Sequence, residues 1–172
     1  MLRFGILTVS DRSAQGIRAD ASGPALKEAI QAQNWIATHQ LVVPDEMAEI
    51  MNALIRWCDS ENIDIILTTG GTGFAPRDVT PEATRAVIER LAPGLTEAML
   101  IESLKITPHA MLSRAVAGIR GTTLIINLPG SPKAAIENFQ IVLPVLPHAI
   151  DLIQNRSSAE TGHHLSPSNK QG

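Results

Sequence analysis

A glycine-rich segment followed by an acidic side chain is the part of this sequence best suited to bind a phosphorylated ligand. Its glycines are Gly70, Gly71 and Gly73, and Asp78 follows shortly afterwards. Glycine tolerates positive φ and lets the backbone approach a ligand closely, so that successive N–H groups can face an anion. A carboxylate beside a phosphate is repulsive unless a cation lies between them, and Mg²⁺ commonly joins the two. The segment therefore predicts a site for a nucleotide or another phosphorylated substrate with Mg²⁺.

This loop carries neither of the two common nucleotide-binding signatures. The P-loop signature ends in Gly-Lys-Ser/Thr, and no lysine lies near the loop. The dinucleotide-binding signature requires a third glycine where Pro76 stands. From the loop alone, a purely structural tight turn stays open as an alternative.

The residues around the loop have the pattern of a strand, a loop and a helix. Residues 63–69 are a mainly apolar, β-branched run, typical of a strand that is buried on both faces. Thr80 and Pro81 form a helix-start signal, with Thr80 as N-cap and Pro81 at the first helical position. The loop would then lie between the carboxyl end of a strand and a helix N-terminus, where anions bind favourably.

Strand and helix patterns alternate along most of the chain. Strands are expected at residues 4–9, 36–43, 63–69, 112–120 and 123–127, and helices at 24–33, 47–58, 81–90, 95–104, around 135–142 and at 145–154. The last two strands are so close in sequence that they can pair only antiparallel. The predicted fold is therefore α/β, a three-layer α/β/α sandwich whose mostly parallel sheet carries one antiparallel strand.

Four polar turns are expected at one edge of this sheet, at residues 10–12, 44–46, 70–78 and 128–132. Ligands of such sheets bind beyond the carboxyl ends of the strands. Within the turns, Asp45 can either cap the next helix or serve the site, and Arg77 can either contact a phosphate or pair with Asp78. Together the four turns predict a binding groove at this edge.

Composition narrows the class of protein. The chain has 172 residues, 44% of them apolar, which suits one domain at residues 1–155 followed by a Ser-, His- and Pro-containing tail at 156–172 that we expect to be disordered. A net charge of −3 without a basic cluster argues against nucleic acid as a partner. No run of about 18 apolar residues is present, so no membrane span is expected. The lack of a signal-peptide pattern and the single cysteine, Cys58, predict a cytoplasmic protein.

The stretch from Thr69 to Gly73, followed by Pro76 to Thr84, resembles the MogA/MoaB family of molybdenum-cofactor biosynthesis proteins. Further matching segments are 43–46, 102–108, 111–114, 118–121 and 127–132, and those from 102 to 121 are similar to the G domains of plant Cnx and gephyrin. The resemblance covers residues 3 to about 154.

The resemblance implies a molybdopterin adenylyltransferase, which converts ATP and molybdopterin into adenylyl-molybdopterin and pyrophosphate with Mg²⁺. It also implies a homotrimer and a partner protein that inserts molybdenum. By resemblance, Asp45 and Asp78 are needed for activity. The chemistry of the residues themselves indicates that Asp78, alone or together with Asp45, holds the Mg²⁺. The residues that would form the nucleotide and pterin site are Ser10, Asp11, Gly70, Gly71, Thr72, Gly73, Ser113, Pro129, Gly130 and Ser131.

Such a reaction suits a site without a general base. The nucleophile would be the terminal phosphate of the pterin, which is mostly dianionic at neutral pH because its second pKa is near 6. Catalysis would then rest on positioning and electrostatics. Two other classes stay open: a non-catalytic pterin-binding or scaffold member, as the gephyrin G domain is also used, and a related domain acting on a different nucleotide, as in CinA-like proteins. Ser113 can also be an ordinary strand serine.

Overall fold

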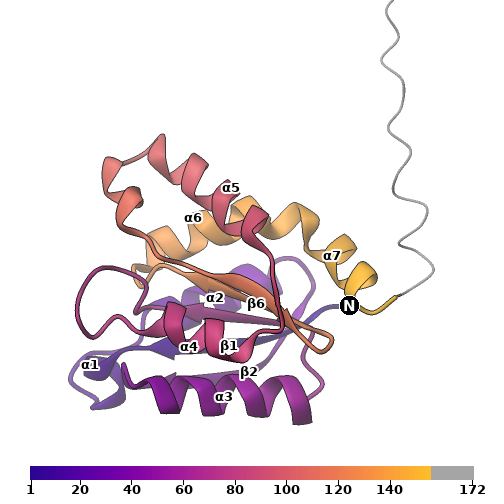
Figure 1. Ribbon diagram of the computed structural model, residues 1–172, viewed down its shortest axis with the longest axis horizontal. Coiled ribbons are helices and arrows are strands. Elements are labelled where there is room, and N and C mark those ends of the chain that lie inside the picture. The colour runs from indigo at the N-terminus through magenta and orange to yellow at the C-terminus, as the bar shows by residue number, and fades with distance from the viewer. Residues whose placement is uncertain (156–172) are drawn as a thin grey trace, which may run out of the picture.

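A six-stranded sheet with the order β2-β1-β3-β6-β5-β4 forms the centre of the computed structural model, which describes residues 1–155 (Figure 1). The strands are β1 (Arg3–Val9), β2 (Ile36–Val43), β3 (Ile65–Thr69), β4 (Arg90–Leu91), β5 (Ala117–Arg120) and β6 (Thr123–Leu128). The helices are α1 (Asp11–Ala14), α2 (Ser22–Gln31), α3 (Met47–Ser60), α4 (Thr80–Val87), α5 (Pro93–Leu104), η1 (Pro108–Leu112), α6 (Pro132–Val142), η2 (Leu143–Val145) and α7 (Leu146–Ile153). The predicted tail, residues 156–172, lies outside the described residues.

Strand directions confirm the predicted mixed sheet. β1, β2, β3 and β6 run parallel, whereas β5 runs antiparallel to both of its neighbours, β6 and β4. The short strand β4 was not expected: the helix predicted to reach residue 90 ends at Val87, and Arg90 pairs with Ile119 instead. The strand predicted at 112–120 is also shorter, because residues 108–112 form a 3₁₀ helix that begins with Pro108.

Helices cover both faces of the sheet, so every central strand is buried on two sides. One core cluster joins the sheet to α2, α5, α6 and α7, and a second joins it to α3 and α4. Figure 1 shows α5, α6 and α7 on one side of the sheet and α3 on the other. Along β6, Leu124 and Ile126 belong to the first cluster and Ile125 to the second, as strand alternation requires. This double cover explains why the strands read as nearly continuous apolar runs.

The helical stretch Pro132–Ile153 is long and apolar enough, by length and composition alone, to cross a membrane. One such helix is only weak evidence for a membrane span, because the core helix of a soluble protein can be equally long and apolar. The residues of this stretch that belong to the first core cluster are Ala135, Phe139, Val142, Leu146 and Ile150. The stretch thus covers one face of the sheet in this fold.

Candidate functional site

The four predicted turns lie together at the carboxyl edge of the sheet. They follow β1, β2, β3 and β6, which are parallel and therefore end at the same edge. The N–H of Ser10 donates to the carbonyl of Val43 at 2.9 Å, which joins the ends of β1 and β2. The N–H of Gly70 donates to the carbonyl of Leu128 at 3.3 Å, which joins the ends of β3 and β6. The predicted clustering of the turns is confirmed.

Two glycines allow the loop after β3 to pass close to its neighbours. Gly70 has φ +105°, and an added Cβ would collide with the carbonyl oxygen of Val9. Gly71 has φ +63°, and an added Cβ would collide with Oγ1 of Thr80 and lie 3.1 Å from Oδ1 of Asp45. Both positions require glycine for conformation and for space.

Thr80 closes the base of the loop. Its N–H donates to the carbonyl of Gly71 at 3.1 Å, and its hydroxyl donates to the carbonyl of Gly70 at 2.9 Å. Thr80 is the first residue of α4, and Val79 occupies the N-cap position. The predicted capping role of Thr80 is therefore wrong. Its side chain fixes the start of the glycine-rich loop instead.

Four consecutive backbone N–H groups of the loop, those of Gly71, Thr72, Gly73 and Phe74, donate no hydrogen bond within residues 1–155. Unpaired backbone donors favour an acceptor. Successive N–H groups in a loop with positive φ angles form a concave site for an anion. This property of the backbone matches the phosphate-binding role predicted from the glycine spacing.

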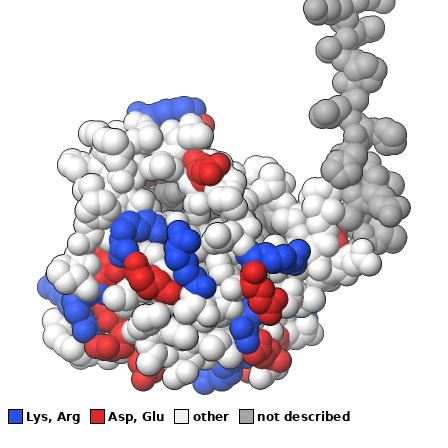
Figure 2. Space-filling model, in the orientation of Figure 1, with Lys and Arg blue, Asp and Glu red and all other residues white. Residues whose placement is uncertain are grey.

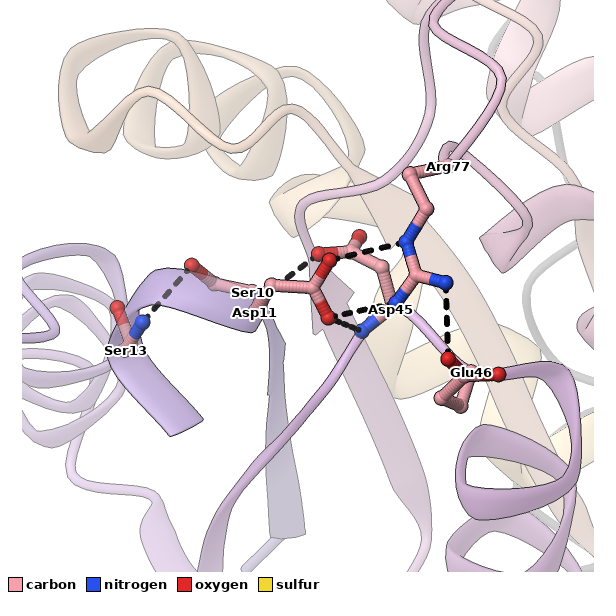
Figure 3. Close-up of polar contacts among 6 residues, drawn as sticks. All are labelled: Ser10, Asp11, Ser13, Asp45, Glu46 and Arg77. Atoms are coloured by element: carbon pink, nitrogen blue, oxygen red, sulfur yellow. Dashed lines mark hydrogen bonds and ion pairs between the residues drawn. The ribbon is translucent and has the colours of Figure 1, made fainter. Parts of the chain in front are cut away.

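The Asp78 carboxylate lies at the return of the loop, half-buried and without an ion-pair partner among residues 1–155. Its Oδ2 accepts the N–H of Ala75 at 2.9 Å, and the N–H of Asp78 donates to the carbonyl of Ala75 at 2.9 Å. Arg77 does not pair with Asp78, so that alternative is wrong. Its Nη2 and Nε bind Asp11 at 2.8 and 3.0 Å, and its Nη1 binds Glu46 at 2.8 Å (Figure 3). The Asp78 carboxylate therefore stays available for a cation.

Asp45 does not cap the helix that follows it. The N-cap position of α3 is occupied by Glu46, whose side chain makes no capping hydrogen bond. The Asp45 carboxylate instead accepts the backbone N–H of Asp11, which links the β1 and β2 turns (Figure 3). The alternative that Asp45 is only a cap is wrong, and its carboxylate belongs to the cluster at the carboxyl edge.

Negative potential accumulates around these carboxylates. Partial burial raises the pKa of Asp45 above its usual value, and the charges of Asp11 and Asp78 raise it further against the opposing hydrogen bond from Asp11. The hydrogen bond from Arg77 lowers the pKa of Asp11. A divalent cation would relieve the repulsion that Asp45 experiences, so Asp45 and Asp78 fit Mg²⁺, which takes oxygen ligands.

The described part of the chain contains no group of three or more His, Cys, Asp or Glu side chains arranged to hold a metal ion. Mg²⁺ at substrate sites is usually held by one or two carboxylates together with phosphate oxygens and water. Two acidic side chains next to an anion-binding loop are therefore a suitable set for Mg²⁺ that arrives with a nucleotide.

A pocket of about 420 Å³ opens on the other side of the loop, between α5, η1 and α6. Thr72 and Gly73 of the loop line one wall, and Ser113 and Pro129 also line it. Most of the remaining wall is apolar, with a few polar groups, as is usual for a site that holds a ring system. Of the predicted site residues, these four share the pocket, and Asp11 and Asp45 lie on the other side of the loop.

The pocket contains polar residues that the sequence analysis did not identify. Nδ2 of Asn138 donates to Oγ of Ser103 at 3.2 Å and to the carbonyl of Ala134 at 2.9 Å. These residues come from α5 and α6, and His109 of η1 lies nearby in the same wall. A polar residue on the apolar face of a helix can indicate a site residue, and Asn138 is such a residue, next to Phe139 on the buried face of α6.

The remaining predicted site residues, Ser10, Gly130 and Ser131, lie in the turns but outside the pocket. Oγ of Ser10 accepts the N–H of Ser13 at 3.2 Å, which makes Ser10 the N-cap of α1. Ser131 occupies the N-cap position of α6 and is exposed, but makes no side-chain capping bond. Gly130 is exposed, and an added Cβ would lie 3.1 Å from the Cα of Gly70. Gly130 therefore keeps the β6 turn close to the glycine-rich loop.

Charged side chains of both signs lie next to one another on the face shown in Figure 2. The ion pairs at the carboxyl edge and on α4 have this form: Arg77 lies between Asp11 and Glu46, and Arg114 pairs with Glu82. Interleaved charges of this kind leave no continuous basic stripe on that face.

A mostly parallel sheet with free loop amides, two carboxylates and a ring-sized pocket at its carboxyl edge is an arrangement suited to a phosphorylated ligand. The family model described as "Probable molybdopterin binding domain" matches residues 5–148. The chain therefore belongs to this family.

Relatives and solved structures agree with this membership. The chain is 45% identical over 154 residues to a molybdopterin adenylyltransferase of Helicobacter pylori, covering 88% of each protein. It is 50% identical over 163 residues to gephyrin of Dictyostelium discoideum, but spans only 22% of that protein's length. The chain is also similar to the crystal structure of the molybdopterin biosynthesis enzyme MoaB from Thermus thermophilus, with a TM-score of 0.86 and 51% sequence identity. The match covers 91% of this chain and 98% of the MoaB chain.

Proposed function

We propose that this chain is a molybdopterin adenylyltransferase of molybdenum-cofactor biosynthesis. The reaction would transfer the adenylyl group of ATP to molybdopterin and release pyrophosphate. The observation that carries the proposal is the set of N–H groups from Gly71 to Phe74, which are unpaired within residues 1–155, next to the Asp78 carboxylate, which has no ion-pair partner there. Relatives of similar length are named for this activity.

In the proposed reaction, an oxygen of the terminal phosphate of molybdopterin attacks the α-phosphorus of ATP. The new P–O bond forms as the bond to the β-phosphate oxygen breaks, and pyrophosphate leaves. The loop amides of residues 71–74 would bind phosphate oxygens, and Asp45 and Asp78 would hold Mg²⁺. When bound, Mg²⁺ supplies positive charge that neutralises the leaving pyrophosphate.

Each side of the loop has a distinct task in this proposal. The pocket lined by Thr72, Gly73, Ser113 and Asn138 would accept a heteroaromatic ring of one substrate. The carboxylate side would hold the triphosphate with its metal. Because the loop forms a wall of both parts, it would bring the two polyanions together in a reactive arrangement.

We also propose a homotrimer located in the cytoplasm, whose product is passed to a protein that inserts molybdenum. Helix α5 supports self-association, because it is rich in apolar residues while only Met99 is buried. Ile101 and the neighbouring Ile106 are 58% and 63% exposed. Light scattering on the purified protein should give three times the mass of the chain, and a monomer at micromolar concentration would contradict this part of the proposal.

The decisive experiment is mass spectrometry of the product formed from molybdopterin, ATP and Mg²⁺. The wild-type protein should form adenylyl-molybdopterin and pyrophosphate. Asp78→Asn should abolish the transfer while fold and pterin binding are largely retained, because an amide oxygen can still accept the N–H of Ala75. Asp59→Asn, far from the groove in an ion pair with Arg120, is the matched control and should stay active. Tight pterin binding without pyrophosphate release would identify a non-catalytic binding protein instead.

A further inference from the structure

Arg114 contacts both limbs of the glycine-rich loop and, at the same time, Glu82 of α4. Its Nε donates to the carbonyl of Gly73 at 2.7 Å, and its Nη2 donates to the carbonyl of Asp78 at 2.6 Å. Its own backbone N–H donates to the carbonyl of Thr72 at 2.9 Å. One residue, located between η1 and β5, thus holds three backbone carbonyls of a loop that follows β3.

These contacts fix the direction of the loop amides. Across a planar trans peptide, the carbonyl of one residue and the N–H of the next point in opposite directions, and the described chain contains no cis peptide. Because the carbonyls of Thr72 and Gly73 face Arg114, the N–H groups of Gly73 and Phe74 face away from it. These two N–H groups belong to the four that are unpaired.

Burial does not hold residues 74–77 of the loop in place. Phe74 is 65% exposed, and residues 75–77 are exposed as well. Exposed loops with few apolar contacts open easily. Hydrogen bonds and ion pairs must therefore set the position of this segment, through Arg114 on the side of α4 and Arg77 on the side of Asp11.

We propose that Arg114 is a positioning residue for adenylyl transfer: it holds residues 72–78 so that the loop amides and the Asp78 carboxylate meet the phosphates and the metal in the correct arrangement. This inference rests on the proposed function. Arg114 acts through the loop and is not a group that touches the reacting atoms. Its planar, forked guanidinium can reach two carbonyls and a carboxylate at once, which a lysine ammonium on a flexible stem cannot do in the same geometry.

Arg114 also neutralises a nearby negative charge. Its guanidinium forms an ion pair with Glu82, which lies in the first turn of α4. The hydrogen bond from Arg114 lowers the pKa of Glu82 against the raising effect of partial desolvation. Without Arg114, the negative charge of Glu82 near the proposed phosphate site would be offset only by the weaker effect of Arg85. Arg114 therefore has two roles: it binds the loop carbonyls, and it neutralises the charge of Glu82. The two roles can be tested separately, because Glu82 can be neutralised without changing Arg114.

The experiment compares four variants: Arg114→Gln, Arg114→Lys, Glu82→Gln and Arg120→Gln. Arg120 is the matched control, since its guanidinium binds Asp59 in a bidentate pair and donates to the carbonyl of Val87, away from the loop. For each variant, kcat, KM for ATP and the half-saturating Mg²⁺ concentration are measured. Amide hydrogen exchange of residues 70–82 gives a readout that needs no substrate.

Arg114→Gln should lower kcat by about 100-fold, as expected for a misplaced site, with a smaller change in KM. It should also raise the half-saturating Mg²⁺ concentration and accelerate exchange in residues 70–82. Arg114→Lys should rescue these properties only in part. Glu82→Gln and Arg120→Gln should stay close to wild type in kcat and in exchange of the loop.

Two results would overturn the proposal: full recovery of kcat and loop protection by Arg114→Lys, which would mean that charge alone suffices, or unchanged loop exchange in Arg114→Gln. If Arg114→Gln does not fold, kcat and the amide hydrogen exchange of residues 70–82 in Arg114→Lys decide whether Arg114 positions the loop. If the wild-type protein forms no adenylyl-molybdopterin, the proposed function fails, while loop exchange still decides whether Arg114 holds the loop.

Discussion

Asp11 and Asp45 hold each other in place through reciprocal hydrogen bonds. The N–H of Asp11 donates to Oδ2 of Asp45 at 2.7 Å, and the N–H of Asp45 donates to Oδ1 of Asp11 at 3.0 Å. The two residues follow β1 and β2 and are 34 positions apart in the sequence. Each carboxylate satisfies a backbone donor and at the same time brings negative charge to the edge of the sheet. Structural and electrostatic roles therefore coincide in the same side chains.

Substitutions at Asp45 should separate these roles. In Asp45→Asn the amide oxygen can still accept the N–H of Asp11, so stability should change little, whereas adenylyl transfer should fall by about 100-fold through loss of charge. Asp45→Ala should also lose stability, by about 1–3 kcal/mol, because the N–H of Asp11 is left without its acceptor. Urea unfolding and product mass spectrometry measure the two effects. Full turnover by the asparagine variant would show that the charge is not used.

Gly70 should be far less tolerant of substitution than a glycine with open surroundings. Gly70→Ala must accommodate φ +105° and a collision with the carbonyl of Val9, so it should cost more than about 3 kcal/mol. Gly16 is the matched control: it also has positive φ, +71°, but nothing lies within 4 Å of an added Cβ. Gly16→Ala should cost only about 1–2 kcal/mol. Equal losses of unfolding free energy would contradict the close approach at Gly70.

Filling the pocket should weaken binding of one substrate without unfolding the protein. Ala134 lines the pocket from α6, and Ala134→Phe would occupy much of its space. The variant should raise KM for the substrate whose ring enters the pocket by about 10-fold or more and leave KM for the other nearly unchanged. Gln140→Phe, on an exposed position of the same helix, is the control. Unchanged KM values for both substrates would show that the pocket is not used.

Asp64 should stabilise the opposite edge of the sheet in a pH-dependent manner. Its buried carboxylate accepts the N–H of Arg3 at 2.8 Å, the Arg3 guanidinium at 2.9 Å, and Nε2 of Gln154 at 2.8 Å. Desolvation acts to raise the pKa of Asp64, but the hydrogen bonds from Arg3 and Gln154 prevail and lower it. Asp64→Asn should therefore cost about 2 kcal/mol at pH 7.

The pH dependence of that cost has a definite sign. The folded-state pKa of Asp64 is depressed, so its contribution is present above the unfolded pKa of about 3.9 and is lost as pH falls through the folded value. The difference in unfolding free energy between wild type and Asp64→Asn should thus shrink below about pH 4. Asp59→Asn, which breaks an exposed and solvent-screened ion pair, should change the unfolding free energy far less than Asp64→Asn. A difference at Asp64 that is constant from pH 7 to pH 3 would contradict this account.

Local sequence pattern was sufficient to predict the fold class and the clustering of the four polar turns. Apolar runs such as residues 63–69 are strands because the sheet is covered on both faces, and the glycine spacing at 70–73 predicted a loop with free amides. The ends of helices and strands could not be predicted from local pattern where pairing with a distant strand decides them. Arg90 and Leu91 form a strand only because β5 provides partners, and two residues carry no periodicity of their own.

The sequence by itself determined that four polar turns meet at one edge, because parallel strands joined by helices must all end there. Only the tertiary structure decided which side chains contact each other across that edge. Arg77 pairs with Asp11 and Glu46 rather than with the adjacent Asp78, and Arg114 reaches the loop from 36 positions away. Such contacts depend on the three-dimensional packing of the turns, and spacing along one segment carries no information about them.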